Sequence, residues 1–172
     1  TEWKNIEDLG TLFQSSKDKP KHGEYIDQRF IDYLSNNPEK LGDMHWRKFE
    51  ELTAEYFHKS GFNVELGPGQ NDDGVDVRVW KEEQDRDSEA PHCIIQCKSQ
   101  KHKIEKVIVK GLYADIQHEK AGYGLIVTSS ELSPGSRKTI QTRGYPIEEI
   151  NKGNLQTWLK ELRTPGSGIV RV

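Results

Sequence analysis

Two short stretches decide the fold: residues 73–80, Asp-Gly-Val-Asp-Val-Arg-Val-Trp, and residues 93–98, Cys-Ile-Ile-Gln-Cys-Lys. Apolar and polar side chains alternate in both stretches, which predicts two β-strands that each bury one face and expose a polar face. If the strands pair across the loop between them, the carboxylate of Asp76, the amide of Gln96 and the ammonium of Lys98 meet at one end of a hairpin. This meeting point is a candidate site for metal binding and catalysis.

The composition indicates one polar domain outside the membrane. The chain has 172 residues, of which 33% are hydrophobic and 31% charged, and this length supports a single core. No stretch approaches the ~20 apolar residues that a membrane span needs, and no signal-peptide pattern is present, so we expect a cytoplasmic location. The net charge of −3 argues against a histone-like binder of nucleic acid but is compatible with a local basic groove.

The two cysteines, Cys93 and Cys97, lie four residues apart in one predicted strand. That spacing separates their α-carbons by about 13 Å, too far for a disulfide or for a shared zinc ion. We therefore expect two small apolar residues on the core face and a reducing compartment.

The helix that begins near Asp43 carries an unusual glutamate. At 100° per residue its aromatic and aliphatic side chains form one continuous arc, and Lys48, Glu51, Glu55 and Lys59 fall on the opposite side. Glu50 instead lies at the edge of the apolar arc. A carboxylate that faces the interior must be paired, hydrogen-bonded or bound to a cation, so Glu50 is either a salt-bridged residue or a third member of the site.

The remaining elements can be placed by periodicity and end signals. Gly61 is expected to end the helix, and residues 81–90 read as an exposed hairpin connection. Ser133 and Pro134 mark the start of a helix as its N-cap and first residue. Further strands are predicted at residues 62–66, 123–128 and 145–150, and further helices over Ile104, Val107, Ile108, Gly111, Leu112 and Ile116 and over Leu155, Trp158, Leu159 and Leu162.

Basic and hydroxyl side chains follow the strand that carries Lys98. Lys101, Lys103 and Lys106 are either a solvated face or a set of contacts to DNA phosphates. Thr128 and Ser129 end another strand, where hydroxyls and amides can meet a phosphate, and a plain turn is the alternative. Asp72 and Asp73 add negative charge near Asp76 but are expected to cap the loop.

The sequence divides into three parts. Residues 1–43 read as a helical extension with helices around Trp3–Phe13 and Tyr25–Leu34, and residues 44–163 form the domain that carries the candidate site. Residues 164–172 begin with Thr-Pro-Gly-Ser-Gly, which is typical of a linker. Together with Thr1 in place of methionine, this tail suggests excision from a longer protein with a further sensor or regulatory domain.

The candidate residues suit the hydrolysis of phosphodiesters. A divalent metal neutralises the developing charge and generates hydroxide near neutral pH. Magnesium, with manganese as a substitute, prefers oxygen ligands, which Glu50, Asp76, Gln96 and the backbone carbonyl of Cys97 can supply. Lys98 points to the same face as Gln96 and can orient the attacking water.

The order of these motifs resembles the Mrr-like family of type IV restriction endonucleases, within the PD-(D/E)XK nuclease superfamily. The resemblance spans about residues 44–162 and rests on Phe49-Glu50-Glu51-Leu52, Gly61-Phe62-Asn63-Val64, Asp73-Gly74-Val75-Asp76, Ile95-Gln96-Cys97-Lys98 and Gly124-Leu125-Ile126-Val127-Thr128-Ser129. It implies an α/β, restriction-endonuclease-like core, with a central mixed β-sheet flanked by α-helices. It also implies magnesium-dependent cleavage of DNA.

Carried over by position, the resemblance makes Asp76 the metal-binding aspartate and Lys98 the catalytic lysine. Gln96 occupies the acidic position and Glu50 is the glutamate of the helix. The amide at Gln96 departs from the superfamily's Asp or Glu and looks like the Mrr-type variant. It removes one negative charge, so metal affinity is expected to be lower or to depend on the substrate phosphate.

The leading interpretation is therefore a metal-dependent DNA endonuclease, the effector domain of a bacterial or archaeal restriction or anti-phage defence protein. A dimer or larger homo-oligomer is expected, because double-strand cleavage needs two active sites. Two alternatives stay open: a non-catalytic DNA-binding or oligomerisation module on the same fold, and a nuclease that acts on RNA or branched DNA.

Overall fold

A five-stranded mixed sheet organises the chain, in the strand order β1-β2-β3-β4-β5. The computed structural model describes residues 24–69 and 74–163. β1, β2 and β3 pair antiparallel, and β3, β4 and β5 pair parallel. The strands are β1 (Asn63–Leu66), β2 (Val77–Trp80), β3 (Cys93–Lys98), β4 (Tyr123–Thr128) and β5 (Ile147–Ile150). The α/β class and the mixed sheet predicted from the sequence are confirmed.

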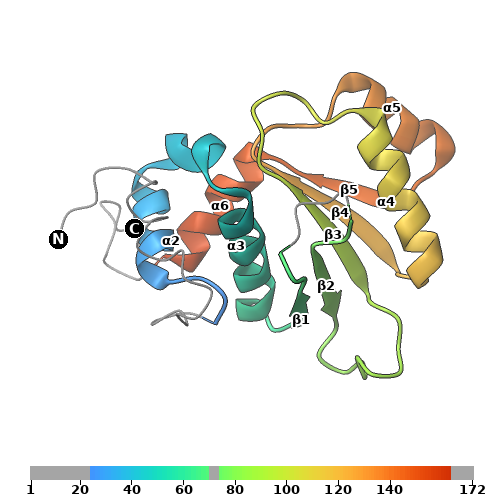
Figure 1. Cartoon of the computed structure of the whole chain (residues 1–172), viewed down its shortest axis with the longest axis horizontal. Coiled ribbons are helices and arrows are strands. Elements are labelled where there is room, and N and C mark those ends of the chain that lie inside the picture. The colour runs from blue at the N-terminus through green and yellow to red at the C-terminus, as the bar shows by residue number, and fades with distance from the viewer. Residues whose placement is uncertain (1–23, 70–73, 164–172) are drawn as a thin grey trace.

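Helices cover both faces of the sheet (Figure 1). One layer consists of α2 (Gln28–Asn36), the short 3₁₀ helix η1 (Pro38–Asp43), α3 (Trp46–Lys59) and α6 (Lys152–Leu162); the other consists of α4 (Lys106–Glu119) and α5 (Pro134–Arg143). The larger core lies under the first layer, and the smaller core lies under α4 and α5.

Local end signals are confirmed where the sequence carried them. Gly61 follows α3 with φ of 98°, a left-handed conformation that glycine adopts without a steric penalty. The hydroxyl of Ser133 accepts the backbone N–H of Ser136 at 3.1 Å and caps α5, and Pro134 is its first residue. The β2–β3 connection is exposed, and Cys93 and Cys97 are both free thiols.

The prediction that each hairpin strand exposes a polar face is wrong. Gln96 is 2% exposed and Ile94 is fully buried, because α4 and its neighbours cover the face that was expected to meet water. Arg78, on β2, donates to Glu119 of α4 at 2.7 Å and neutralises its charge against that helix. Both faces of β3 are therefore buried over residues 93–96.

The buried face predicted for α4 is wrong at two positions, Val107 and Gly111, which are both exposed. Val107 was placed on the buried side but is 72% exposed, whereas Val109 is fully buried. Ile104 does not begin the helix: it forms an isolated bridge with Leu132, and α4 starts two residues later. Val109 and Leu112 then face the sheet, and Val107, two residues from Val109, points about 200° away.

Glu55 was expected among the solvated charges of α3 and is instead fully buried. Its Oε1 accepts the backbone N–H groups of Tyr25 at 2.8 Å and Ile26 at 3.2 Å. The chain that precedes α2 covers this side of α3, which a helical wheel of α3 alone could not show. Glu55 thus attaches the segment before α2 to the domain.

The segment predicted as an N-terminal extension is continuous with the core in its described part. Ile26, Leu34 and Leu41 are buried in the larger core together with side chains of α3. The boundary at residue 43 stays a prediction. The helix expected around Trp3–Phe13 and the linker at residues 164–172 lie outside the described residues. No helix in residues 24–69 and 74–163 has the length and apolar character of a membrane span.

Replacing Glu55 with alanine is expected to destabilise the protein by about 3 kcal/mol, because two N–H groups, one of them buried, lose their acceptor. The measurement is urea unfolding followed by circular dichroism. Glu55→Gln keeps the accepting oxygen and should lose much less, and Glu82→Ala, in the exposed β2–β3 connection, should lose almost nothing. Equal losses for Glu55→Ala and Glu82→Ala would contradict the role of Glu55.

Candidate active site

α3 places Glu50 against the sheet. The helix packs its apolar side chains into the larger core, and Glu50 is 5% exposed at the edge of that surface. The prediction that this carboxylate faces the interior is confirmed. Burial of an ionised carboxylate is costly, so its partners decide whether it can stay charged.

Asp76 lies where the β2–β3 ladder ends. Its backbone N–H donates to Ile95 O at 2.9 Å, in continuation of the ladder. Its side-chain Oδ2 accepts the N–H of Cys97 at 2.7 Å. In a continued ladder, a backbone carbonyl of the neighbouring strand would accept this N–H. Asp76 O also accepts from the N–H of Gly67 at 2.8 Å. These bonds fix the carboxylate, which is 7% exposed, at the end of the hairpin.

The structure brings Glu50 and Asp76 together. Burial raises the pKa of Glu50 to about 7, and the negative charge of Asp76 and a hydrogen bond between the two carboxyl groups add to the shift. Such mutual repulsion is the normal consequence of two carboxylates that share a site shielded from water. This position therefore favours either a shared proton or a cation.

Gln96 and Lys98 are the residues before and after Cys97, whose backbone N–H bonds to Asp76. Both are on β3, where Gln96 is paired with Ile126 and Lys98 with Thr128 of β4. Gln96 is buried and Lys98 is partly exposed. Strand alternation places them on the side opposite Cys97. Their participation with Glu50 and Asp76, and that of the Cys97 carbonyl, stays a prediction.

The thiol of Cys97 belongs to the core side of β3. Its Sγ donates to the hydroxyl of Thr53 on α3 at 3.5 Å. Burial, followed by the charge of Asp76, raises the pKa of Cys97 well above its usual value. The sulfur is therefore a protonated packing atom and not a thiolate ligand.

Arg47 is a site residue that the sequence analysis missed. Its Nη1 donates to Glu50 Oε1 and to Gly67 O, each at 2.9 Å. Gly69 has φ of 82°, and a Cβ at that position would lie 2.9 Å from the guanidinium carbon, so the backbone fits closely against Arg47. The guanidinium lowers the pKa of Glu50, against the effects of burial and of Asp76. The sequence signal that could have identified Arg47 is its position three residues before Glu50 on the same helix, where the two side chains are neighbours.

The predicted DNA contacts divide into exposed and buried residues. Lys101, Lys103 and Lys106 are exposed, and Lys101 and Lys103 form ion pairs with acidic neighbours. Thr128 is fully buried and its hydroxyl accepts the N–H of Ser130 at 3.0 Å, while Ser129 bonds to the loop after β3. Phosphate contacts by these five residues stay predictions, and the two hydroxyls already have internal partners.

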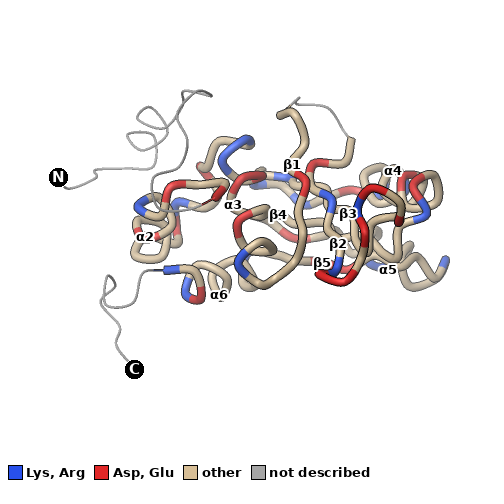
Figure 2. The backbone as a smooth tube through the Cα atoms, turned by 90° about the horizontal axis from the view of Figure 1, so that it is seen from below, with Lys and Arg blue, Asp and Glu red and all other residues tan. Residues whose placement is uncertain are grey.

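Charges of both signs are interleaved over the described chain (Figure 2). Among residues 24–69 and 74–163, no three His, Cys, Asp or Glu side chains gather closely enough to hold a metal ion by themselves. The structure brings together the two carboxylates of Glu50 and Asp76, and Asp72 and Asp73 lie outside the described residues. A metal here would need ligands beyond carboxylates.

A mixed sheet with helices on both faces, and acidic residues at the end of its antiparallel hairpin, defines the restriction-endonuclease-like fold. The modification-dependent restriction endonuclease AspBHI has a similar structure, with a TM-score of 0.54 and 14% identity over 78% of this chain and 35% of AspBHI. The protein of unknown function AF1548 is similar at a TM-score of 0.50 and 17% identity, over 72% of this chain and 70% of AF1548.

Residues 41–159 match the family model Mrr_cat, described as restriction endonuclease, and the chain belongs to this family. The restriction endonuclease MspJI, solved in complex with a 27-mer oligonucleotide, matches at a TM-score of 0.45 and 16% identity over 97% of this chain and 37% of MspJI. The chain thus spans about a third of the length of AspBHI and of MspJI. No protein with curated annotation matches.

Glu50→Gln is expected to stabilise the metal-free protein at neutral pH. The unfolded chain releases the Glu50 proton near its ordinary pKa of 4.5, whereas the folded protein holds it until about pH 7. Folding stability therefore falls as the pH rises between these values. Glutamine does not ionise, so the gain should be about 3 kcal/mol above pH 7 and vanish below about pH 4.5.

Urea unfolding of both proteins from pH 4 to pH 8, in the presence of a chelator, measures this difference. Glu82→Gln, a substitution in the exposed loop, is the matched control and should show no such pH dependence. A destabilised Glu50→Gln at pH 7.5 would mean that the carboxylate is stabilising in its ionised form.

Proposed function

We propose that this chain is a metal-dependent DNA endonuclease, the catalytic part of a bacterial or archaeal restriction or anti-phage defence protein. Its membership in the restriction endonuclease family supports the reaction class. The contact between Glu50 and Asp76 beside the Gln96–Lys98 strand is the observation that carries the proposal, because buried paired carboxylates are suited to a divalent cation.

The donor set fits magnesium, with manganese as a substitute. Asp76 and Glu50 would supply carboxylate oxygens, and Gln96 and the Cys97 carbonyl would supply neutral oxygens. When bound, the cation would neutralise the phosphate charge and activate water for phosphodiester hydrolysis. Because only two ligands are charged, an oxygen of the DNA phosphate is a natural further ligand.

The chain's own residues have distinct roles in this proposal. Lys98 places an ammonium beside the reacting phosphate, where it offsets charge and orients the water. Arg47 holds Glu50 by one oxygen and ties it to Gly67, and so limits the positions that the carboxylate can take. The exposed Lys101, Lys103 and Lys106 would meet DNA phosphates next to the site. A dimer or larger assembly would supply the second active site for double-strand cuts.

Replacing Lys98 with alanine should lower cleavage of plasmid DNA at least about 100-fold, since a positioned charge at the reacting phosphate is lost. The assay follows supercoiled plasmid with magnesium or manganese by gel electrophoresis. Lys160→Ala, which removes an exposed charge on α6, should retain full activity. Unchanged cleavage by Lys98→Ala would reject the assignment of this site.

A second candidate, a non-catalytic DNA-binding or oligomerisation module, is favoured by two observations. Gln96 brings no charge to the site, and Arg47 already compensates Glu50. The site therefore has little net negative charge with which to attract a cation. A measurement of metal binding on a variant that does not cleave DNA distinguishes this candidate from the nuclease.

Calorimetric titration of the Lys98→Ala variant with manganese should show weak binding alone and at least about tenfold tighter binding with duplex DNA, because a phosphate oxygen completes the ligand set. Asp76→Asn should bind no metal in either condition. No binding to the Asp76-containing protein, with or without DNA, would favour the non-catalytic module.

A further inference from the structure

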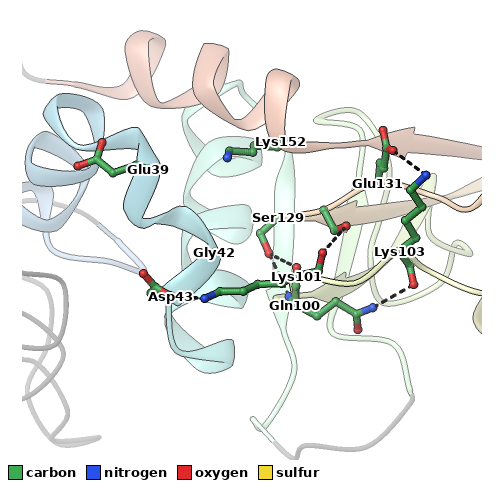
Figure 3. A pocket seen from close by; sticks show the side chains of 10 residues that line it. Glu39, Gly42, Asp43, Gln100, Lys101, Lys103, Ser129, Glu131 and Lys152 are labelled. Carbon is green, nitrogen blue, oxygen red and sulfur yellow. Dashed lines mark hydrogen bonds and ion pairs between the residues drawn. The ribbon is translucent and has the colours of Figure 1, made fainter.

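A pocket of about 520 Å³ lies at the carboxyl ends of the parallel strands, lined by residues other than Glu50 and Asp76. Its volume is within the range of small-ligand sites, roughly 300–1,000 Å³. Figure 3 shows its lining, and its charged members are Glu39, Asp43, Lys101, Lys103, Glu131 and Lys152.

The sheet topology explains why a pocket forms at this place. Gln100–Lys103 follow β3, Ser129–Glu131 follow β4 and Lys152 begins α6 after β5, so each parallel strand contributes its carboxyl end. The 3₁₀ helix η1 closes the remaining side. In open α/β sheets ligands bind in the crevice outside the carboxyl ends of the strands, because neighbouring connections diverge there.

The floor of the pocket is held by its own hydrogen bonds. Ser129 Oγ accepts the N–H of Gln100 at 3.0 Å and donates to Gln100 O at 3.0 Å. Ser130 Oγ donates to Lys101 O at 3.2 Å. The loops after β3 and β4 are thereby fixed to each other, and a ligand would meet a floor whose shape is already set.

The lysines at the rim can change partners at little cost. Lys101 pairs with Asp43 at 3.3 Å and Lys103 with Glu131 at 3.5 Å, and all four side chains are at least 45% exposed. Exposed pairs of this kind contribute about 0–1 kcal/mol each. Within the part of the chain that the structure describes, the ammonium of Lys152 has no hydrogen bond or ion pair. In Figure 3, Lys152 and Lys101 lie on opposite sides of the pocket.

We propose that this pocket binds one phosphorylated nucleotide, with its phosphate on Lys152. The lining has three ammonium groups and three carboxylates, so it has no net charge to hold a bare anion or a bare cation. A nucleotide offers acceptors on the phosphate and donors on the base or sugar. The donors suit the carboxylates of Glu39 and Asp43.

The nucleotide can come from two sources with the same chemistry. Gln100 lies two residues after Lys98, and Ser99 Oγ donates to Met44 O at 2.8 Å, just before α3. The pocket and the candidate active site are therefore built on the same loop and the same helix junction. An unpaired nucleotide of a bound DNA strand and a free mononucleotide both fit; the first source rests on the proposed nuclease function.

The test is calorimetric titration of the metal-free protein with 5′-deoxyadenylate, deoxyadenosine and inorganic phosphate. The nucleotide should bind at least about tenfold more tightly than either fragment, because only it engages both charge sets. Lys152→Gln should weaken it by about tenfold, the effect of one charge-assisted hydrogen bond. Lys160→Gln, on the exposed face of the same helix, should leave it unchanged.

Two results would overturn the proposal: phosphate binding as tight as nucleotide binding, or equal losses in Lys152→Gln and Lys160→Gln. Competition with a short single-stranded oligonucleotide assigns the source: displacement indicates a DNA strand, and no displacement a free nucleotide. Plasmid cleavage is read separately. Cleavage without nucleotide binding rejects the pocket alone, and nucleotide binding without cleavage rejects the nuclease alone.

Discussion

The contact between Glu50 and Asp76 is the constraint on which the site depends. Two carboxylates that are 5% and 7% exposed are held side by side, although each disfavours the charge of the other. They cannot separate, because α3 is packed on the sheet and Asp76 is bonded to the N–H of Cys97. The interior of the domain thus maintains an electrostatically unfavourable pair of carboxylates, and this pair is the basis of the proposed cation site.

Arg47 offsets part of the repulsion between Glu50 and Asp76, and the two carboxylates stay in contact. Its guanidinium bonds one oxygen of Glu50 and, through Gly67, the loop that follows β1. A single side chain therefore sets the position of the helix carboxylate and attaches the chain segment that leads towards Asp76. The same contact reduces the net negative charge around Glu50 and Asp76 and so lowers the cost of burying the two carboxylates together.

The mixed sheet separates two chemical regions that share one loop. Its antiparallel half ends at Asp76, where the ladder stops and a carboxylate takes the place of a carbonyl. Its parallel half ends at the pocket, where three strand ends and η1 leave a space lined by both signs of charge. The loop after Lys98 lines the pocket and directly follows the strand that carries Gln96 and Lys98.

Features that depend on neighbouring residues could be predicted from the sequence: the strand positions, the N-cap at Ser133 and the inward direction of Glu50 all follow from periodicity and local hydrogen bonding. It also placed the carboxylates, the amide and the lysine in family order. The burial of Glu55, the exposure of Val107 and the contact of Arg47 with Glu50 could not be predicted in this way and became visible in the folded chain. These depend on which elements pack together, as when Glu55 accepts N–H groups some thirty positions away. Periodicity within one element carries no information about the surface that covers it.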